Sequence, residues 1–108
     1  MKTLAEGRWF ELSLMEQLAN VGCDVDRAIR WKSRNNIPYH QDALKRALDL
    51  LDLTIQDRKN RKRLRELGRM REILKDYFIG DNSYAYTDEA LQKYFIDYNY
   101  LAAIQKGK

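Results

Sequence analysis

Cysteine, histidine, proline and long apolar runs are scarce in this chain of 108 residues. A single cysteine, Cys23, excludes an internal disulfide, and one cysteine with one histidine cannot supply the four ligands of a structural zinc site. The longest uninterrupted apolar run, residues 100–104, has five residues, whereas a membrane-spanning helix needs about 20. We therefore expect no transmembrane segment, no metal site and no cofactor.

The composition is that of one small folded domain. Hydrophobic residues make up 44% and charged residues 33% of the chain, so it can form a core and remain soluble, and we expect a single domain over residues 1–108. Charged side chains at Glu6, Arg8 and Glu11 interrupt the start of the chain, which argues against a secretory signal. The sequence thus predicts a cytoplasmic location.

The basic residues are concentrated in one segment. The formal net charge of the chain is +4, but residues 58–71 contain eight basic residues and one acid, Glu66, which gives this segment a net charge of +7. The rest of the chain is therefore net −3. Such a concentrated excess creates a local field that attracts phosphates or an acidic partner, whereas an even spread would favour only solubility.

The low content of proline and glycine and the abundance of helix-forming residues predict an all-α chain. Apolar residues recur at spacings of three and four along four segments, which is the period of a helix with one buried face. The expected helices span residues 9–33, 39–56, 59–79 and 88–105. Short connections between them favour an antiparallel four-helix bundle with a long first helix.

Local signals predict where these helices begin and end. Pro38 and two nearby asparagines predict a turn between the first and second helices. Asp57 can cap the start of the third helix, and Gly80 favours a stop at its end. A polar loop follows over residues 81–86, and Thr87 offers a cap for the last helix.

On a continuous third helix, the exposed basic side chains form one stripe. At 100° per residue, five of them fall within an arc of about 100°, opposite the apolar face. A stripe three turns long, about 16 Å, can follow a phosphate backbone. The alternative is a solvated face neutralised by acids of a neighbouring helix, such as Asp49, Asp52 or Asp57. The five basic residues are Arg58, Arg61, Lys62, Arg65 and Arg69.

Arg71 lies on the apolar side of the same helix and so differs from the stripe. Its guanidinium must either reach solvent along its apolar stem or pair with a carboxylate inside the fold. We expect a structural ion pair, with Glu11 on the apolar arc of the first helix as the candidate partner.

Aromatic residues gather towards the C-terminus, and two of them, Tyr84 and Tyr86, fall in the predicted loop. Exposed tyrosines beside a basic surface can stack on unpaired bases or form an interface. The alternative is that these tyrosines fold back and cover the end of the bundle.

The first helix has a second feature, which bears on assembly. Leu12, Ala19 and Cys23 lie opposite its main apolar stripe. Small residues at such positions permit the close approach of another helix, so we expect a homo-oligomeric contact here. Cys23 is then expected to serve packing rather than reactivity.

Patterns typical of catalysis are missing. His40 is the only histidine, no spacing suggests a Ser/His/Asp or Cys/His arrangement, and there is no glycine-rich phosphate loop. Two pairs of carboxylates, Asp24 with Asp26 and Asp49 with Asp52, fit exposed helix faces. We expect that the protein is not an enzyme.

Four segments, residues 14–22, 46–55, 76–82 and 91–95, resemble a widespread group of small helical prokaryotic proteins without an assigned activity. In size, helicity and basic character the chain also resembles, at the level of the fold alone, certain four-helix-bundle proteins. These are typified by the intervening-sequence proteins of large ribosomal RNA and the accessory proteins of diversity-generating retroelements. That resemblance implies a basic oligomer that binds nucleic acid.

A comparison with the HEPN ribonucleases, which are also small helical bundles, points away from catalysis. Their signature is an arginine, four intervening residues and a histidine, but the residue five before His40 is Asn35, and Arg34 is six before it. The active motif is missing. The resemblance implies at most an inactive relative, with His40 as a surface or capping residue.

Together these features predict a non-enzymatic helical bundle that self-associates and presents the basic stripe to RNA or DNA, largely without reading sequence. Phosphate contacts would supply the affinity, and Tyr84 or Tyr86 would add stacking. The alternative is a protein-interaction or adaptor subunit in which the same stripe docks on an acidic protein.

Overall fold

The computed structural model describes the backbone of residues 4–106 and the side chains of residues 7–98 and 100–104. The ends of the predicted domain, residues 1–3 and 107–108, lie outside the described residues. The start of the chain, from which we expect no secretory signal, therefore lies partly outside them as well. Every regular element in the described range is helical, which confirms the all-α prediction. No helix in that range is long and apolar enough to cross a membrane. The elements are α1 (Leu4–Glu11), α2 (Leu14–Ser33), α3 (Ile37–Gln56), the 3-10 helix η1 (Arg58–Arg63), α4 (Leu64–Phe78) and α5 (Asp88–Lys106).

The helix predicted over residues 9–33 is two helices, because the chain turns at Ser13. Ser13 has an extended backbone (φ −67°, ψ 163°), and its hydroxyl accepts a hydrogen bond from the Glu16 amide at 3.2 Å. In return, the Glu16 carboxylate accepts one from the Ser13 amide at 3.1 Å, which completes a capping box. The expectation of one long first helix is therefore wrong, since the capping box starts α2 and leaves α1 as a short separate helix.

The helix predicted over residues 59–79 is also divided. The chain first forms η1, and α4 begins only at Leu64. Asp57 caps η1 as expected, because its carboxylate accepts a hydrogen bond from the Lys59 amide at 3.2 Å. The change of helix type matters for the basic segment, since a 3-10 helix repeats every three residues and an α-helix every 3.6.

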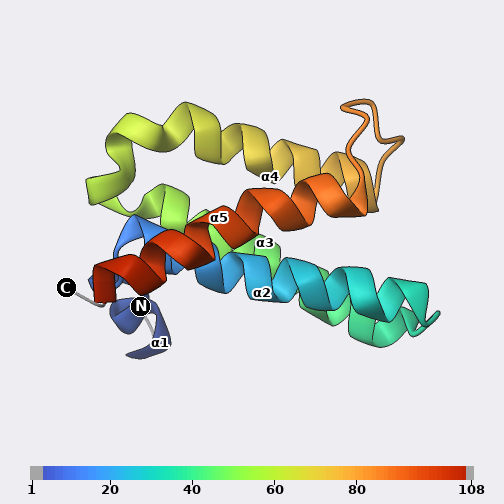
Figure 1. Ribbon diagram of the computed structural model, residues 1–108, viewed down its shortest axis with the longest axis horizontal. Coiled ribbons are helices and arrows are strands. Elements are labelled where there is room, and N and C mark those ends of the chain that lie inside the picture. The colour runs from blue at the N-terminus through green and yellow to red at the C-terminus, as the bar shows by residue number, and fades with distance from the viewer. Residues whose placement is uncertain (1–3, 107–108) are drawn as a thin grey trace.

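Figure 1 shows how the helices lie. The α2–α3 turn and the α4–α5 loop lie at one end of the molecule, and η1 and α1 lie at the other. α2 packs against α3 and α5, and α3 packs against α1, α4 and η1. In the α2–α3 turn, Asn35 adopts a left-handed backbone (φ 59°) and the Asn36 side chain caps α3. The first turn of α3 accommodates Pro38, so the helix starts at Ile37 rather than at the predicted Tyr39.

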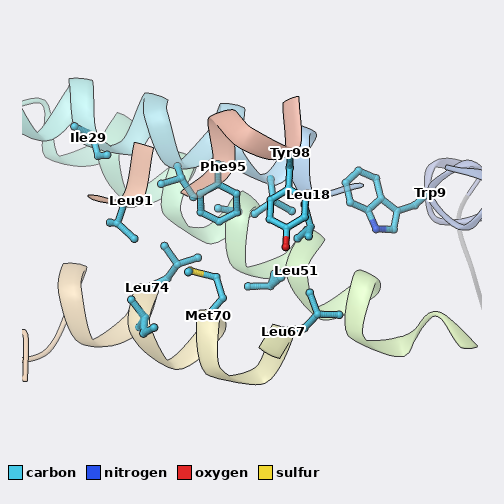
Figure 2. Packing of buried hydrophobic residues seen from close by; sticks show 14 residues of the cluster. Trp9, Leu18, Ile29, Leu51, Leu67, Met70, Leu74, Leu91, Phe95 and Tyr98 are labelled. Atoms are coloured by element: carbon cyan, nitrogen blue, oxygen red, sulfur yellow. The ribbon is translucent and has the colours of Figure 1, made fainter. Parts of the chain in front are cut away.

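The core is filled by large side chains that reach across from α4 (Figure 2). Leu67, Met70 and Leu74 of α4 lie in the same cluster as Phe95 and Tyr98 of α5. Each fully buried side chain of this size contributes about 1.5–3 kcal/mol relative to its exposed form. Most of the apolar stripes predicted for the other helices are buried as expected, including Leu18, Val21, Val25, Leu51 and Leu91, but Leu101, predicted to face the core from α5, is 42% exposed.

α2 and α5 approach each other closely at Gly22. A Cβ atom at this position would lie 2.5 Å from the Cβ of Phe95, closer than two carbon atoms can pack. The absence of a side chain at Gly22 therefore makes the space that α5 occupies. Gly68 of α4 is the opposite case, because a Cβ atom there would have no heavy atom within 4 Å.

The two glycines give a matched test of this packing. We expect Gly22→Ala to lower the free energy of unfolding by about 1–3 kcal/mol, because the added methyl group forces Phe95 outward. Gly68→Ala should raise it by about 0.5–1 kcal/mol, because alanine forms helix better than glycine and meets open space. Urea unfolding followed by circular dichroism measures both. Changes of the same sign would contradict the close contact between α2 and α5.

Candidate nucleic-acid interface

The 3-10 geometry of η1 sorts the residues of the basic segment onto different faces. Three residues per turn place Asp57, Asn60 and Arg63 on one side. Asp57 and Asn60 are buried, with Asn60 only 2% exposed, and Arg63 is half-buried. Arg61 and Lys62 fall between these positions and are exposed. The helix type therefore directs the amide inward and the neighbouring cations outward.

Asn60 is held by hydrogen bonds that connect several helices. Its side-chain amide donates to Gln17 Oε1 at 2.8 Å and to the Thr54 carbonyl at 2.9 Å. The Gln17 amide in turn donates to Asp57 Oδ2 at 2.9 Å and to the Trp9 carbonyl at 3.0 Å. The Trp9 indole donates to the Thr54 hydroxyl at 3.1 Å. These five residues form a buried amide network that joins α1, α2, α3 and η1.

Lys59 is bonded to other groups of the fold, although 40% of its side chain is exposed. Its ammonium group donates to the Phe10 carbonyl at 3.0 Å and forms an ion pair with Asp57. Burial alone would raise the pKa of the Asp57 carboxyl, but hydrogen bonds from Lys59 and Gln17 outweigh it and hold that pKa below its usual value. Asp57 is therefore a carboxylate at neutral pH, and Lys59 anchors η1 to the end of α1.

Arg63 and Glu66 link the start of α4 to α5. Arg63 Nε donates to Glu66 Oε2 at 2.8 Å, and a terminal nitrogen of Arg63 donates to the Tyr98 hydroxyl at 3.1 Å. Glu66 Oε1 accepts hydrogen bonds from the hydroxyls of Tyr98 at 2.7 Å and Tyr94 at 3.1 Å. The hydrogen bond from Arg63, assisted by those from the two tyrosines, lowers the pKa of Glu66 against the opposing effect of burial.

Arg71 forms the structural ion pair expected for it, but with a different partner. Its Nε lies 2.5 Å from Asp52 Oδ1, and a terminal nitrogen lies 3.3 Å from Oδ2. This bidentate pair joins α4 to α3, and the hydrogen bond to Asp52 raises the pKa of Arg71. Glu11, the expected partner, is exposed at the end of α1. The predicted pair with Glu11 is therefore wrong, because α3 brings Asp52 beside α4.

Five cations of the segment remain on the outside, and we name them the basic surface. All five are exposed, and within the described residues no ion pair includes any of them. The basic surface consists of Arg58, Arg61, Lys62, Arg65 and Arg69. The acids considered as their partners pair with other cations, namely Asp49 with Lys45, Asp52 with Arg71 and Asp57 with Lys59.

The basic surface is not the straight stripe that an α-helical period predicts. Arg58, Arg61 and Lys62 lie on η1, whereas Arg65 and Arg69 lie four residues apart on α4. The chain changes direction between these two elements (Figure 1). The five positive charges therefore cover a bend at one end of the molecule instead of a line along one helix.

The loop between α4 and α5 lies at the end of the molecule opposite η1, but the side chain of Tyr84 reaches back along α4. Both carboxylate oxygens of Asp76 accept backbone hydrogen bonds, from Ser83 at 2.8 Å and from Tyr84 at 3.0 Å. Tyr84 is 42% exposed, and its hydroxyl donates to Glu72 at 3.1 Å. This hydrogen bond raises the pKa of Tyr84, while the charge of Arg69 acts in the opposite direction. Tyr84 thus lies within electrostatic reach of the α4 part of the basic surface.

Tyr86 has a different environment. It is half-buried and packs against the main core cluster, and its backbone exchanges two hydrogen bonds of 2.9 Å with the Asn82 side chain. Tyr86 therefore folds back against the core, which is the alternative to an exposed tyrosine that stacks on a base. Of the two predicted tyrosines, Tyr84 is therefore the more exposed.

Sequence reasoning missed Gln17 and Asn60, the residues that orient η1. One local signal was present, because Asp57 and Asn60 stand three residues apart beside a run of cations, which matches one face of a 3-10 helix. Gln17 gave no such signal, since it lies 43 residues from Asn60 along the chain and only the tertiary fold brings them together.

Two polar residues expected on the surface are buried. His40 is 7% exposed, with its Nδ1 2.8 Å from the Ala28 carbonyl and its ring against Phe78. Asp24 is buried and pairs with two arginines. The expectations of a surface or capping histidine and of an exposed Asp24 are wrong, because each side chain has a partner on a neighbouring helix. In the part of the chain that the structure describes, no three potential metal ligands lie together.

Comparisons with known proteins give no relative for this chain. It matches no protein-family model, and neither the curated proteins nor the solved structures contain a match to it. The resemblance to small helical prokaryotic proteins therefore stays an expectation.

Removing the amide of Asn60 tests whether the buried network holds η1. We expect Asn60→Ala to lower the free energy of unfolding by about 2–3 kcal/mol, because Gln17 and the Thr54 carbonyl lose their donor in a buried site. Arg61→Ala is the matched control, and as a surface change it should stay within about 0.5 kcal/mol. Urea unfolding measures both. Equal effects of the two substitutions would show that the network does not stabilise η1.

The lowered pKa of Glu66 predicts a pH-dependent contribution to stability. Because the folded state favours the carboxylate, this contribution is present above the ordinary pKa of 4.5 and is lost as the pH falls through the lower folded-state value. We expect the difference in free energy of unfolding between the unaltered protein and Glu66→Gln to shrink between about pH 6 and pH 3. A constant difference, measured by denaturant titration across this range, would contradict the role given to Arg63.

Proposed function

We propose that this protein is a non-enzymatic, self-associating helical protein that binds RNA or DNA through the basic surface, largely without reading sequence. One observation carries this assignment. The cations of the segment divide into three that bind acids of the fold, Lys59, Arg63 and Arg71, and five exposed ones that do not. The charges of the first group are paired with carboxylates of the protein, whereas those of the second are available for phosphates.

The proposed function takes α2 to α5 as an antiparallel four-helix bundle, with α1 and η1 across one end. Chain reversals at the α2–α3 turn, at η1 and at the α4–α5 loop support this arrangement. A connection at the end of a bundle can contact a ligand without any change in the core. The resemblance to basic four-helix-bundle proteins that bind nucleic acid supports the same function as an analogy of fold.

The chemistry and shape of the basic surface suit a flexible strand. Four of its five residues are arginines, whose planar guanidinium groups can bind phosphate oxygens in pairs. Because these residues cover a bend, a single strand or a looped RNA can follow them more easily than a duplex, which stays straight over about 150 base pairs. Tyr84, at the α4 side, can add stacking on an unpaired base once its hydrogen bond to Glu72 opens.

A salt titration tests binding to phosphates directly. Five phosphate contacts predict that the logarithm of the association constant falls with the logarithm of the salt concentration with a slope of about −3.5 for a single strand. Replacing Arg61, Lys62 and Arg65 together by glutamate should lower the affinity at low salt by more than about 100-fold, since three attractions become repulsions. Fluorescence anisotropy with a labelled oligonucleotide measures both quantities.

A second triple variant controls for net charge. Arg30, Lys32 and Arg34 are exposed at the end of α2, away from η1, and their replacement by glutamate changes the net charge by the same amount. We expect this control to keep most of the affinity. Equal losses in the two variants would assign binding to net charge alone, and no binding at low salt would exclude the function.

An acidic protein is the alternative partner for the same five cations. Capture of partners from cells, repeated after nuclease treatment, distinguishes it from nucleic acid, because an acidic protein would stay bound after the nuclease. Capture by the unaltered protein and by the control variant, but not by the variant of the basic surface, would favour this adaptor role over nucleic-acid binding.

A further inference from the structure

α5 has apolar residues on both of its sides. Its inner side buries Phe95 and Tyr98 in the core. On its outer side three large apolar side chains are exposed, Ile96 at 61%, Tyr100 at 69% and Ile104 at 41%. At 100° per residue these three lie within an arc of about 80°, nearly opposite the inner side. A helix that is apolar on both sides has a second surface to bury.

The exposed residues are arranged symmetrically about Tyr100. Ile96 precedes it by four residues and Ile104 follows it by four. The three exposed residues therefore have the same order, isoleucine, tyrosine and isoleucine, from either end of the helix. If a second copy of α5 lies antiparallel across a two-fold axis at Tyr100, each Ile96 meets an Ile104 and the two tyrosines meet at the axis. Asp97 then lies opposite Ala103, a small residue that leaves room for close approach.

This outer face also points away from the basic surface. Tyr94 and Tyr98 reach Glu66 of α4 from the inner side of α5, so the outer face lies on the side opposite α4. On α5 the charged residues beside the exposed apolar ones are Lys93 and Asp97, whose charges cancel, and Asp26 of α2, which lines a hollow with Ile96, pairs with Arg30. Two copies of this basic chain can therefore meet here without bringing their basic surfaces together.

Shallow hollows continue the face from α5 onto α2. One of about 390 Å³ is lined by Ala19, Cys23 and Ile96 among others, and one of about 290 Å³ by residues that include Leu12 and Ala103. The three residues of the first predicted helix that were expected at an oligomer contact thus border the outer face of α5. Side chains of a second copy can extend over this border.

We propose that the outer face of α5 is a two-fold interface with a second copy of this chain. The three exposed side chains present on the order of 350 Å² of mainly apolar surface, against about 800 Å² per partner in a standard interface. They form the centre of the contact, and the border on α2 supplies the remainder. Self-association is part of the proposed function, on which this interface rests, but the interface does not require nucleic acid.

The mass of the protein in solution tests the interface. Sedimentation equilibrium over a concentration series, without nucleic acid, should show a monomer of 12.9 kDa converting to twice that mass. Ile96→Glu should weaken association at least about tenfold, because the two-fold axis places the buried charge in the contact twice. Ile79→Glu is the matched control, since Ile79 is 66% exposed on another part of the surface, and it should leave the mass unchanged.

Single cysteines test the pairing itself, in a Cys23→Ala background that removes the exposed native thiol. Under mild oxidation Tyr100→Cys should give a disulfide-linked dimer. Ile96→Cys alone should not, because the two copies of residue 96 lie about 12 Å apart along the helix axis, beyond the reach of a disulfide. A mixture of Ile96→Cys and Ile104→Cys should link. Circular dichroism of each variant checks that it folds, as expected for exposed positions.

Three results would overturn this interface. They are a monomer at all concentrations, a dimer that Ile96→Glu leaves intact, and efficient linking of Ile96→Cys to itself. Failure of the proposed nucleic-acid binding would appear separately, as an oligonucleotide that does not bind to a protein whose mass still doubles. Conversely, salt-dependent binding by a strict monomer would keep the basic surface and remove the interface.

Discussion

The hydrogen bond that the buried Asn60 amide donates to the buried Gln17 side chain is the interaction on which the rest of the structure depends. A buried polar group without a partner costs about 1–3 kcal/mol, so the side-chain oxygen of Gln17 requires the Asn60 amide in place. Because Gln17 lies on α2 and Asn60 on η1, their contact fixes where the chain leaves α3 and in which direction α4 starts. The same network includes Trp9 and Thr54, and it thereby seats α1 against α3.

This arrangement explains how one run of cations serves both folding and surface charge. Lys59 and Arg63 lie beside carboxylates because the inward face of η1 and the first turn of α4 bring them there. Arg61 and Lys62, which lie between them, are exposed, and within the described residues neither forms an ion pair. An uninterrupted α-helix, with its period of 3.6 residues, would spread Asp57, Asn60 and Arg63 over an arc of about 120°, whereas three residues per turn align them. The type of helix, more than the number of charges, therefore decides which cations are available.

Apolar spacing in the sequence was sufficient to predict the all-α class, the approximate bounds of α3 and α5, and most of the core, because these depend on contacts within one helix period. The break at Ser13 was missed because the apolar period continues across it, although Ser13 and Glu16 carry the capping-box pattern. Tertiary partners decided the rest. The sequence indicated that Arg71 must pair, but only the packing of α3 beside α4 selects Asp52. His40 is buried for the same kind of reason, since the carbonyl that it contacts belongs to α2.

The placement of the two surfaces has a consequence for the kind of ligand that an assembly of this chain would favour. Under the proposed function, five cations without groups that read bases would give one copy an affinity that comes from ionic contacts and falls steeply with salt. A second copy joined through α5 would supply a second basic surface, and a strand bound at the first would reach the second at a high effective concentration. Since the outer face of α5 lies opposite α4, the two basic surfaces would lie on opposite sides of the dimer. Only a strand long enough to pass around it would gain from both, so the length of a nucleic acid, rather than its sequence, is the property that such a dimer would distinguish.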